Sequence, residues 1–284
     1  MSRSWTRPAS TAESAAPEGD SPRPAKSDWP FYLCFGILGG VYVVLLLAML
    51  VADVFFTQPG QLLKSLDDEE IRYSIWLSLL SCSITTILSL WVAVPIGYLM
   101  SRLNFRGKTL LDALLDIPIV LPPLVLGVSL LILFRYPPFA WFSRMVVYEV
   151  PAVILAQFMV ACAFAVRTMR VTFDQISPRA EQVALTLGCT RAQAFWRVVF
   201  PEARRGLLTA GTLAWARSLG EFGPIVVFAG STPLRTEVLS TTIFLQMQAG
   251  RIHAALAVSL LMIVAAVVVL VIARVFGLKG SGLI

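Results

Sequence analysis

Six long apolar stretches constrain the fold of this chain more than any other feature of its sequence. Each is about as long as the 20-residue α-helix that crosses the hydrocarbon core of a bilayer. Because that core offers no water to backbone groups, such segments must be helical or closed into a barrel. The lengths predict an all-α polytopic membrane protein with about six transmembrane helices. The stretches are Phe31 to Phe56, Ile75 to Met100, Leu110 to Phe134, Pro151 to Val171, Leu207 to Phe228 and Ala254 to Phe276.

The third stretch differs from the others because Pro118, Pro122 and Pro123 interrupt it. Proline within a span is tolerated where neighbouring helices or water satisfy the carbonyls that it leaves free. We therefore expect a kinked helix packed within the helix bundle.

The composition agrees with a membrane protein, since 57% of the residues are hydrophobic, 14% are charged and the mean hydropathy is +0.77. Residues 1–29 are rich in Pro, Ser, Ala and Glu, which predicts a disordered cytoplasmic tail. No apolar core precedes Phe31, and the stretch that begins there is long for a signal peptide, so we expect an uncleaved anchor. Residues 30–284 would form the transmembrane domain.

Lys and Arg residues gather on one side of the predicted spans, and this bias sets the orientation. The opposite loops hold fewer of them, together with the acidic run Asp67-Asp68-Glu69-Glu70. Both termini are therefore expected in the cytoplasm. This topology explains the net charge of +6, and no soluble basic face for nucleic acid is visible. The basic residues on the cytoplasmic side are Arg3, Arg7, Arg23, Lys26, Arg102, Arg106, Lys108, Arg167, Arg170, Arg179, Arg191, Arg197, Arg204, Arg205, Arg274 and Lys279.

The loop between the fourth and fifth stretches, about residues 172–206, predicts two short helices. Ser177 and Pro178 fit an N-cap and a first helical position, and Glu181 lies where a negative charge suits the helix dipole. Gly188 fits a left-handed stop. A capping box from Thr190 to Gln193 then starts a second helix, which Pro201 is expected to end at about Phe200.

The second of these helices carries an apolar stripe, and the loop also carries a basic rim. Such a helix pair suits docking into a groove of a partner, or else lying on lipid headgroups, for which Trp196 is also suited. The sequence by itself leaves both readings open. The stripe comprises Ala194, Phe195, Val198 and Val199, and the rim comprises Arg179, Arg191 and Arg197.

A charged pair lies inside the fifth apolar stretch, where Arg217 and Glu221 are four residues apart and so share one helix face. Charges at this depth cost about 2.5 to 3.5 kcal/mol each on insertion scales and face a bundle interior or a water-filled path. The pair is either a structural ion pair or part of a pathway or gate, and one residue can serve both roles. Gly220 and Gly223 would let the backbone bend there.

Several further sequence features argue against catalytic activity or a metal site in this chain. Gly107-Lys108-Thr109 lacks the glycine that a phosphate loop needs five residues earlier, so no ATP hydrolysis is expected of this chain. A single histidine, His253, and no Gly-x-Ser-x-Gly argue against a hydrolase, and four scattered cysteines support neither disulfides nor zinc.

The segment from Thr236 to Met247 is amphipathic and is placed outside the membrane. There it would line the mouth of the pathway, meet a binding protein or pack on the helix bundle.

The 172–206 loop resembles the cytoplasmic "EAA" loop of permease subunits in bacterial ATP-driven importers, the ABC importers. In that family the loop docks into the ATPase subunit, so the resemblance implies an ATPase-coupling loop here. Val183 stands where the family often has alanine, and Leu185 where a polar residue is common. The coupling residues that the resemblance implies are Glu181, Gln182, Ala184, Gly188 and Pro201.

The run from Ala216 to Gly223, Ala-Arg-Ser-Leu-Gly-Glu-Phe-Gly, resembles the fifth-span signature of molybdate, tungstate and sulfate importer permeases. Pro224 stands where several relatives have alanine, so the local bend would differ. The resemblance implies a pathway for molybdate or tungstate, with a sulfate or thiosulfate importer as the alternative. A permease for another solute, such as phosphate or an amino acid, and an ATP-independent channel or carrier are the remaining alternatives. The implied pathway or gate residues are Arg217, Ser218, Gly220, Glu221 and Gly223.

The same resemblance implies the partners. These are two cytoplasmic ATPase subunits, which would bind ATP and Mg²⁺, an extracytoplasmic oxyanion-binding protein and a second permease chain. Because one chain carries all six stretches, we expect a homodimer in the lipid of a prokaryotic inner membrane. No catalytic residue, metal or cofactor is expected in the chain itself.

Overall fold

The computed structural model describes residues 29–56 and 66–279, and every regular element in those ranges is helical. The chain divides into two compact units, Met1–Leu50 and Val51–Ile284, of which the first contains most of helix α1. The expected tail of residues 1–29 lies, apart from Trp29, outside the described residues.

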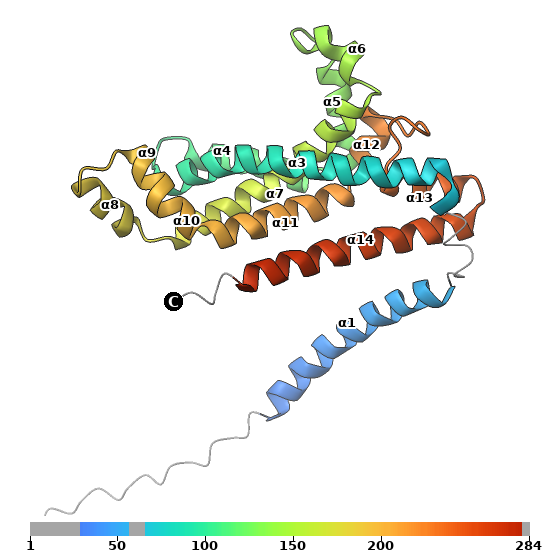
Figure 1. Cartoon of the computed structure of the whole chain (residues 1–284), viewed down its shortest axis with the longest axis horizontal. Helices are drawn as coiled ribbons and strands as arrows, with labels where there is room; N and C mark the ends of the chain where they lie inside the picture. Colours follow the sequence, from blue (N-terminus) through green and yellow to red (C-terminus); the bar gives the residue numbers. More distant parts are fainter. Residues whose placement is uncertain (1–28, 57–65, 280–284) are drawn as a thin grey trace, which may run out of the picture. The chain divides into compact units, whose positions relative to one another are not determined.

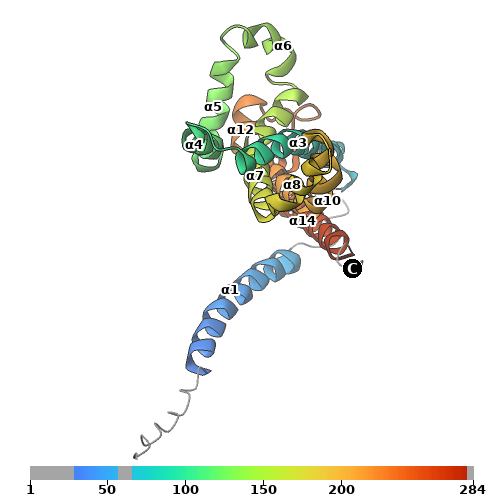
Figure 2. The same ribbon diagram turned by 90° about the vertical axis from the view of Figure 1, so that its left-hand side faces the viewer.

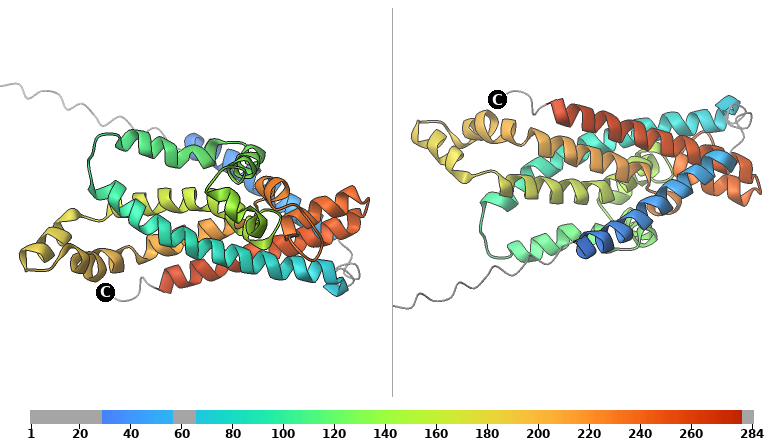
Figure 3. Two further views of the ribbon diagram at one scale, coloured as in Figure 1. Left: turned by 90° about the horizontal axis from the view of Figure 1, so that it is seen from above. Right: turned by 90° about the horizontal axis from the view of Figure 1, so that it is seen from below.

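Within residues 29–56 and 66–279, four helices are long and apolar enough to cross a bilayer, and a bent helix pair described below could form a fifth span. The four are α1 (Trp29–Phe56), α3 (Glu69–Arg102), α7 (Val150–Gln175) and α14 (Ile252–Lys279). They coincide with the first, second, fourth and sixth apolar stretches, and α3, α7 and α14 run roughly parallel in Figures 1 and 3. Asp68 caps α3, accepting a hydrogen bond from the Glu70 amide at 3.0 Å.

The third stretch forms two helices, α4 (Lys108–Val120) and α5 (Pro123–Leu133), bent by 110° at their junction. Pro122 lacks the amide hydrogen that would continue α4, and Pro123 begins the next helix. The expected kink is present, and α4 packs against α7, although none of its residues is buried. Helix α5 rises away from α3 and α7 and leads into η1 (Phe139–Phe142) and α6 (Ser143–Val146), as Figures 1 and 2 show.

The fifth stretch is also broken. Helix α11 (Arg204–Leu219) is followed by a non-helical turn and then by α12 (Gly223–Phe228). The 16 residues of α11 are fewer than a full span needs, so the stretch reaches span length only with both helices. Helix α13 (Leu239–Gln248) matches the predicted amphipathic segment and packs against α14.

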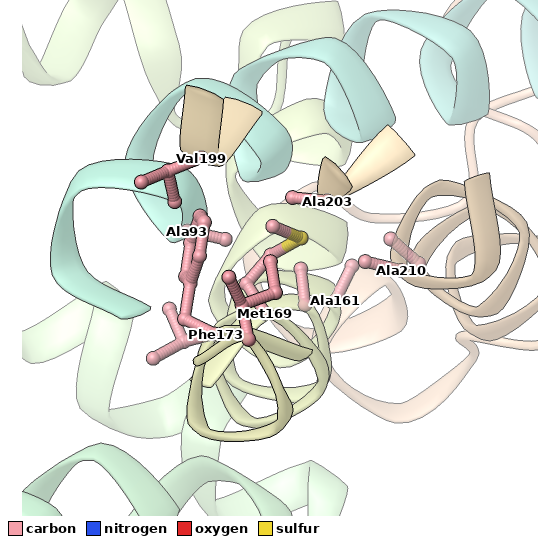
Figure 4. Close-up of a cluster of buried hydrophobic side chains, with 11 residues drawn as sticks. Ala93, Ala161, Met169, Phe173, Val199, Ala203 and Ala210 are labelled. Carbon is pink, nitrogen blue, oxygen red and sulfur yellow. The ribbon is translucent and has the colours of Figure 1, made fainter. Parts of the chain in front are cut away.

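The core is built from small side chains, which let the helices approach closely. Helix α3 makes its largest contact with α7, and α11 packs against both. Figure 4 shows Met169 and Phe173 of α7 gathered with Ala93 of α3 and Val199 of the loop of residues 172–206. The close packing holds α3, α7 and α11 together beneath that loop.

The loop of residues 172–206, which is expected in the cytoplasm and is called the cytoplasmic loop below, is helical and projects beyond the ends of the long helices (Figures 1 and 3). It comprises α8 (Pro178–Thr186), α9 (Arg191–Ala194), a π-helical turn η2 (Phe195–Val199) and α10 (Phe200–Glu202). The Ser177 cap, the Thr190–Gln193 capping box and the left-handed Gly188, with φ +88°, are all as predicted.

The predicted stop at Phe200 is wrong, because helical structure continues through Pro201 to Glu202. In the π-helical turn the Phe200 amide bonds to the Phe195 carbonyl five residues back. The hydrogen-bond pattern restarts after this widened turn, and Pro201 then occupies the first turn of α10, where a missing amide hydrogen costs nothing.

Candidate docking loop and transport pathway

The outward face of the cytoplasmic loop combines exposed apolar side chains with arginines. Val183, Leu187 and Trp196 are 57%, 80% and 61% exposed. Arg179, Arg191 and Arg197 are exposed as well, as expected. An apolar patch with a charged rim is typical of a protein interface.

The predicted apolar stripe faces inward instead. Ala194 and Val199 are buried, and Val199 belongs to the core cluster formed with α3 and α7. Phe195 packs on Tyr98 and Phe173, with ring centroids 4.9 Å and 6.3 Å away. The stripe therefore attaches the loop to its own helix bundle.

Glu181 fixes the start of the loop to the end of α3. Its carboxylate accepts a hydrogen bond from the Tyr98 hydroxyl at 2.5 Å and pairs with Arg102 at 3.2 Å. Arg102 also donates to the Ile176 carbonyl at 3.0 Å. Glu181 is only 8% exposed, so these hydrogen bonds satisfy a nearly buried charge. No sequence pattern near Glu181 announces Tyr98 or Arg102, which lie 83 and 79 residues away.

The other residues proposed for the coupling loop occupy different surroundings. Gln182 and Gly188 are exposed, Ala184 is buried and Pro201 is half-buried. A side chain at Gly188 would meet open space, so glycine is needed there for its backbone conformation alone.

The two broken spans meet at their breaks. A Cβ atom added to Gly223 would lie 2.8 Å from the Pro123 Cβ, and one added to Gly127 would lie 2.9 Å from the Pro224 Cα. Only glycine permits so close an approach. The first turns of α5 and α12 are thereby brought together, although they are distant in the sequence.

A cavity of about 290 Å³ lies at this junction. On its wall Arg217 pairs with Glu221 at 2.9 Å, as the spacing predicted. Glu221 is 1% exposed, whereas the Arg217 side chain is 31% exposed. The Arg217 guanidinium also lies 5.8 Å from the centroid of the Phe164 ring. The partly open cation is the group that can meet a solute.

Four of the five predicted pathway residues line this cavity, namely Arg217, Gly220, Glu221 and Gly223. Ser218 does not, since it is buried and its hydroxyl donates to the Ala214 carbonyl at 2.8 Å. The sequence did not single out the facing residues Pro122, Pro123 and Leu124 as pathway residues. The pair of prolines in an apolar stretch was the available signal.

The segment before α13 is attached to the ends of α3 and α7. Arg235 pairs with Glu149, and its carbonyl accepts from the Tyr73 hydroxyl at 3.2 Å. The Tyr148 amide donates to the Phe228 carbonyl at 3.3 Å. Residues 229–238, called the outer segment below, therefore connect α12 to the neighbouring helices.

Long apolar helices, two broken apolar stretches around a charged cavity and an attached helical loop define a polytopic membrane protein of the transport class. Residues 93–279 match the sequence profile of the family described as binding-protein-dependent transport system inner membrane component, and the chain belongs to this family. It is accordingly a transport subunit of the inner membrane and not a catalytic one.

Similar proteins include two named permeases. The chain is 32% identical to the sulfate transport system permease protein CysT of Escherichia coli (strain K12), over 80% of this chain and 84% of that protein. It is 32% identical to the molybdate/tungstate transport system permease protein WtpB of Pyrococcus abyssi, over 71% and 79%.

A solved structure shares the fold. It is the crystal structure of a bacterial ABC transporter involved in the import of the acidic polysaccharide alginate. The TM-score is 0.70 at 17% identity, with 89% of this chain and 96% of that chain covered.

Proposed function

We propose that the chain is the permease subunit of an ATP-driven importer for a tetrahedral oxyanion. Molybdate or tungstate is the first candidate, and sulfate or thiosulfate is the alternative. The observation that carries the proposal is the Arg217–Glu221 pair beside a cavity where two broken spans meet. Similar permeases named for sulfate and for molybdate/tungstate support both candidates and leave the choice between them to experiment.

The cavity chemistry supports a small anion. Arg217 offers a fixed, partly exposed cation, while Glu221 reduces its net charge. Such a wall attracts an anion without holding it tightly, which conduction requires.

The cytoplasmic loop supports coupling to an ATPase. Val183, Leu187 and Trp196 present apolar surface beside three arginines, and Glu181 ties this surface to α3. Closure of an ATPase dimer would pull on the loop and shift the bundle between two states. ATP and the loaded binding protein would each have to favour one state for transport to occur.

The proposed assembly contains two copies of this chain, two ATPase subunits and one extracytoplasmic binding protein. The family description, which names binding-protein-dependent transport, supports the last of these. ATP and Mg²⁺ would be bound by the ATPase. Lipid would surround the exposed apolar faces of the long helices.

Uptake of radiolabelled molybdate and sulfate tests the substrate, in cells that lack their own importers and express this chain with the neighbouring ATPase and binding protein. Molybdate uptake blocked by tungstate but not by sulfate would establish the first candidate. Equal block by sulfate would establish a broad or sulfate-type importer. An assembled, ATP-hydrolysing complex that carries neither anion would contradict the oxyanion proposal.

The same preparation separates the importer from an ATP-independent channel or carrier. An importer requires the ATPase to co-purify with this chain, and uptake must stop when the ATPase is inactivated. Uptake that persists without a functional ATPase would contradict the proposal.

A further inference from the structure

Gln157 of α7 is a polar side chain that is buried although it is not hydrogen-bonded to a charged group. It is 1% exposed and lies between α3 and α11. Its Oε1 atom accepts from the Thr85 hydroxyl at 3.2 Å, and its Nε2 atom donates to the Ser218 carbonyl at 3.3 Å. A buried amide is stabilising only when its donors and acceptors are satisfied, and these bonds join three helices at one point.

The Ser218 carbonyl stands at the start of the α11–α12 break. In an unbroken helix it would accept from residue 222, but α11 ends at Leu219. It accepts instead from the Glu221 amide at 3.2 Å and from Gln157. The Gln157 side chain from α7 thus replaces a hydrogen bond that the Ser218 carbonyl loses where the helix is interrupted.

The Glu221 carbonyl, on the far side of the break, is held by a different element. The Ser240 hydroxyl of α13 donates to it at 2.7 Å. The neighbouring Leu239 amide donates to the Ser78 hydroxyl at 2.8 Å, which fixes the first turn of α13 to α3. The position of Ser240 is therefore set by two helices that do not contain the charged pair.

We propose that Gln157 and Ser240 are positioning residues for the Arg217–Glu221 pair. By holding the Ser218 and Glu221 carbonyls, they fix the break in the shape that places Arg217 on the cavity wall. Neither residue lines the cavity, so neither touches the solute. The consequence for transport rests on the proposed function, whereas the effect on the break does not.

This arrangement also links the outer segment to the cavity. Ser240 follows the outer segment by two residues, and α13 begins between them. A displacement of α13 would release the Glu221 carbonyl and loosen the pair. A partner that contacts the outer segment can thus change the cavity without itself reaching the cavity.

Paired substitutions test the proposal in the complete complex with its ATPase and binding protein, held in lipid nanodiscs for hydrogen exchange and in sealed lipid vesicles for transport. Ser240→Ala removes the hydroxyl, and Ser240→Thr retains it. Gln157→Leu removes both hydrogen-bonding groups at similar size. Ser83→Ala is the matched control, because the Ser83 hydroxyl donates only to the Leu79 carbonyl of its own helix.

Two quantities are measured, amide hydrogen exchange over residues 219–226 and anion carried per ATP hydrolysed, for both sulfate and molybdate. Loss of one hydrogen bond should speed exchange there by about fivefold. Ser240→Ala and Gln157→Leu should also lower the number of anions carried per ATP. Ser240→Thr and Ser83→Ala should behave as the unmodified chain does.

The proposal would be overturned if Ser240→Ala left both the amide hydrogen exchange over residues 219–226 and the number of anions carried per ATP unchanged. If Gln157→Leu does not assemble, the Ser240→Ala and Ser240→Thr pair decides alone. Faster exchange at 219–226 in a complex whose unmodified form carries neither anion would support the positioning role and contradict the oxyanion function.

Discussion

Buried carboxylates mark the joints of this protein. Glu181 joins the cytoplasmic loop to α3, and Glu221 stands at the break between α11 and α12. Glu237 lies in the outer segment and is 1% exposed. Each carboxyl group is costly to bury in its charged form, so each identifies a position where burial is tolerated for a structural or functional reason.

Removal of Glu221 alone is expected to be more harmful than removal of the whole pair. Glu221→Ala leaves Arg217 without its partner, at a cost below the about 3–5 kcal/mol of a fully buried pair because Arg217 is partly exposed. The folded yield should fall. The double variant Arg217→Leu with Glu221→Leu should recover yield but not uptake. A Glu221→Ala variant with normal yield and transport would show that the pair has neither role.

Glu237 predicts a pH dependence of stability. Burial raises its pKa above the ordinary glutamate value, and the nearby Glu70 and Asp68 raise it further, while the Thr242 hydroxyl lowers it. The folded state therefore binds the proton more tightly than the unfolded state does. The stability from this group is full at low pH and is lost as pH rises through the raised pKa.

Thermal unfolding of the purified protein between about pH 5 and pH 8 checks this sign. Glu237→Gln, a neutral side chain of the same shape, should raise the melting temperature at the upper end and flatten the profile. Parallel profiles for the two proteins would contradict the assignment.

Residue-level prediction from the sequence succeeded where partners are local. Arg217 and Glu221 are one helical turn apart, so their pairing follows from helix geometry. The partners of Glu181 come from α3 and those of Gln157 from α3 and α11. Only the packing of distant helices brings such groups together, so no local pattern reveals them.

Among the elements, the cytoplasmic loop carries the sharpest test. Gly188 has φ +88° and open space around it. Gly188→Val should therefore cost about 1–3 kcal/mol through backbone strain alone. Gly188→Asn should be tolerated, because asparagine adopts the left-handed region more readily.

Co-purification with the ATPase and uptake are the measurements for this pair of variants. Loss of both with valine and retention with asparagine would support the docking role. Normal assembly and uptake with valine would contradict it.

The elements also show which local signals are sufficient. Caps and a left-handed glycine are set by neighbours in the sequence, and the loop helices began where predicted. The direction of the apolar stripe was not predictable in the same way. Periodicity says that a helix has an apolar face, but not whether that face meets its own bundle or a partner. The prolines of the third stretch predicted a kink, whereas the angle of 110° was not predictable from them.

For the whole molecule, the distribution of Lys and Arg predicts that both termini lie in the cytoplasm. A fluorescent reporter that matures only in the cytoplasm should be bright when fused to either terminus. Inserted after Ser231 in the outer segment it should be dark, and inserted after Asn104 it should be bright as the control. A bright insertion after Ser231 would reverse the proposed orientation.

At this scale the sequence predicted the class well, because hydropathy and length are properties of single segments. The helical fold is confirmed, and four of the six predicted spans are full-length helices in the described part of the chain. The cavity could not be predicted from the sequence, since it arises where residues near 122 and residues near 222 meet.

The bonds of Glu181 have a mechanical consequence. A load applied to the outward face of the loop does not stretch a flexible tether, because the carboxylate is held by both Tyr98 and Arg102. The load would pass directly to α3 and from there to α7, because α3 and α7 share a long contact. If the loop couples to an ATPase as proposed, its movement would therefore be passed to α3 and α7 without a flexible tether between them.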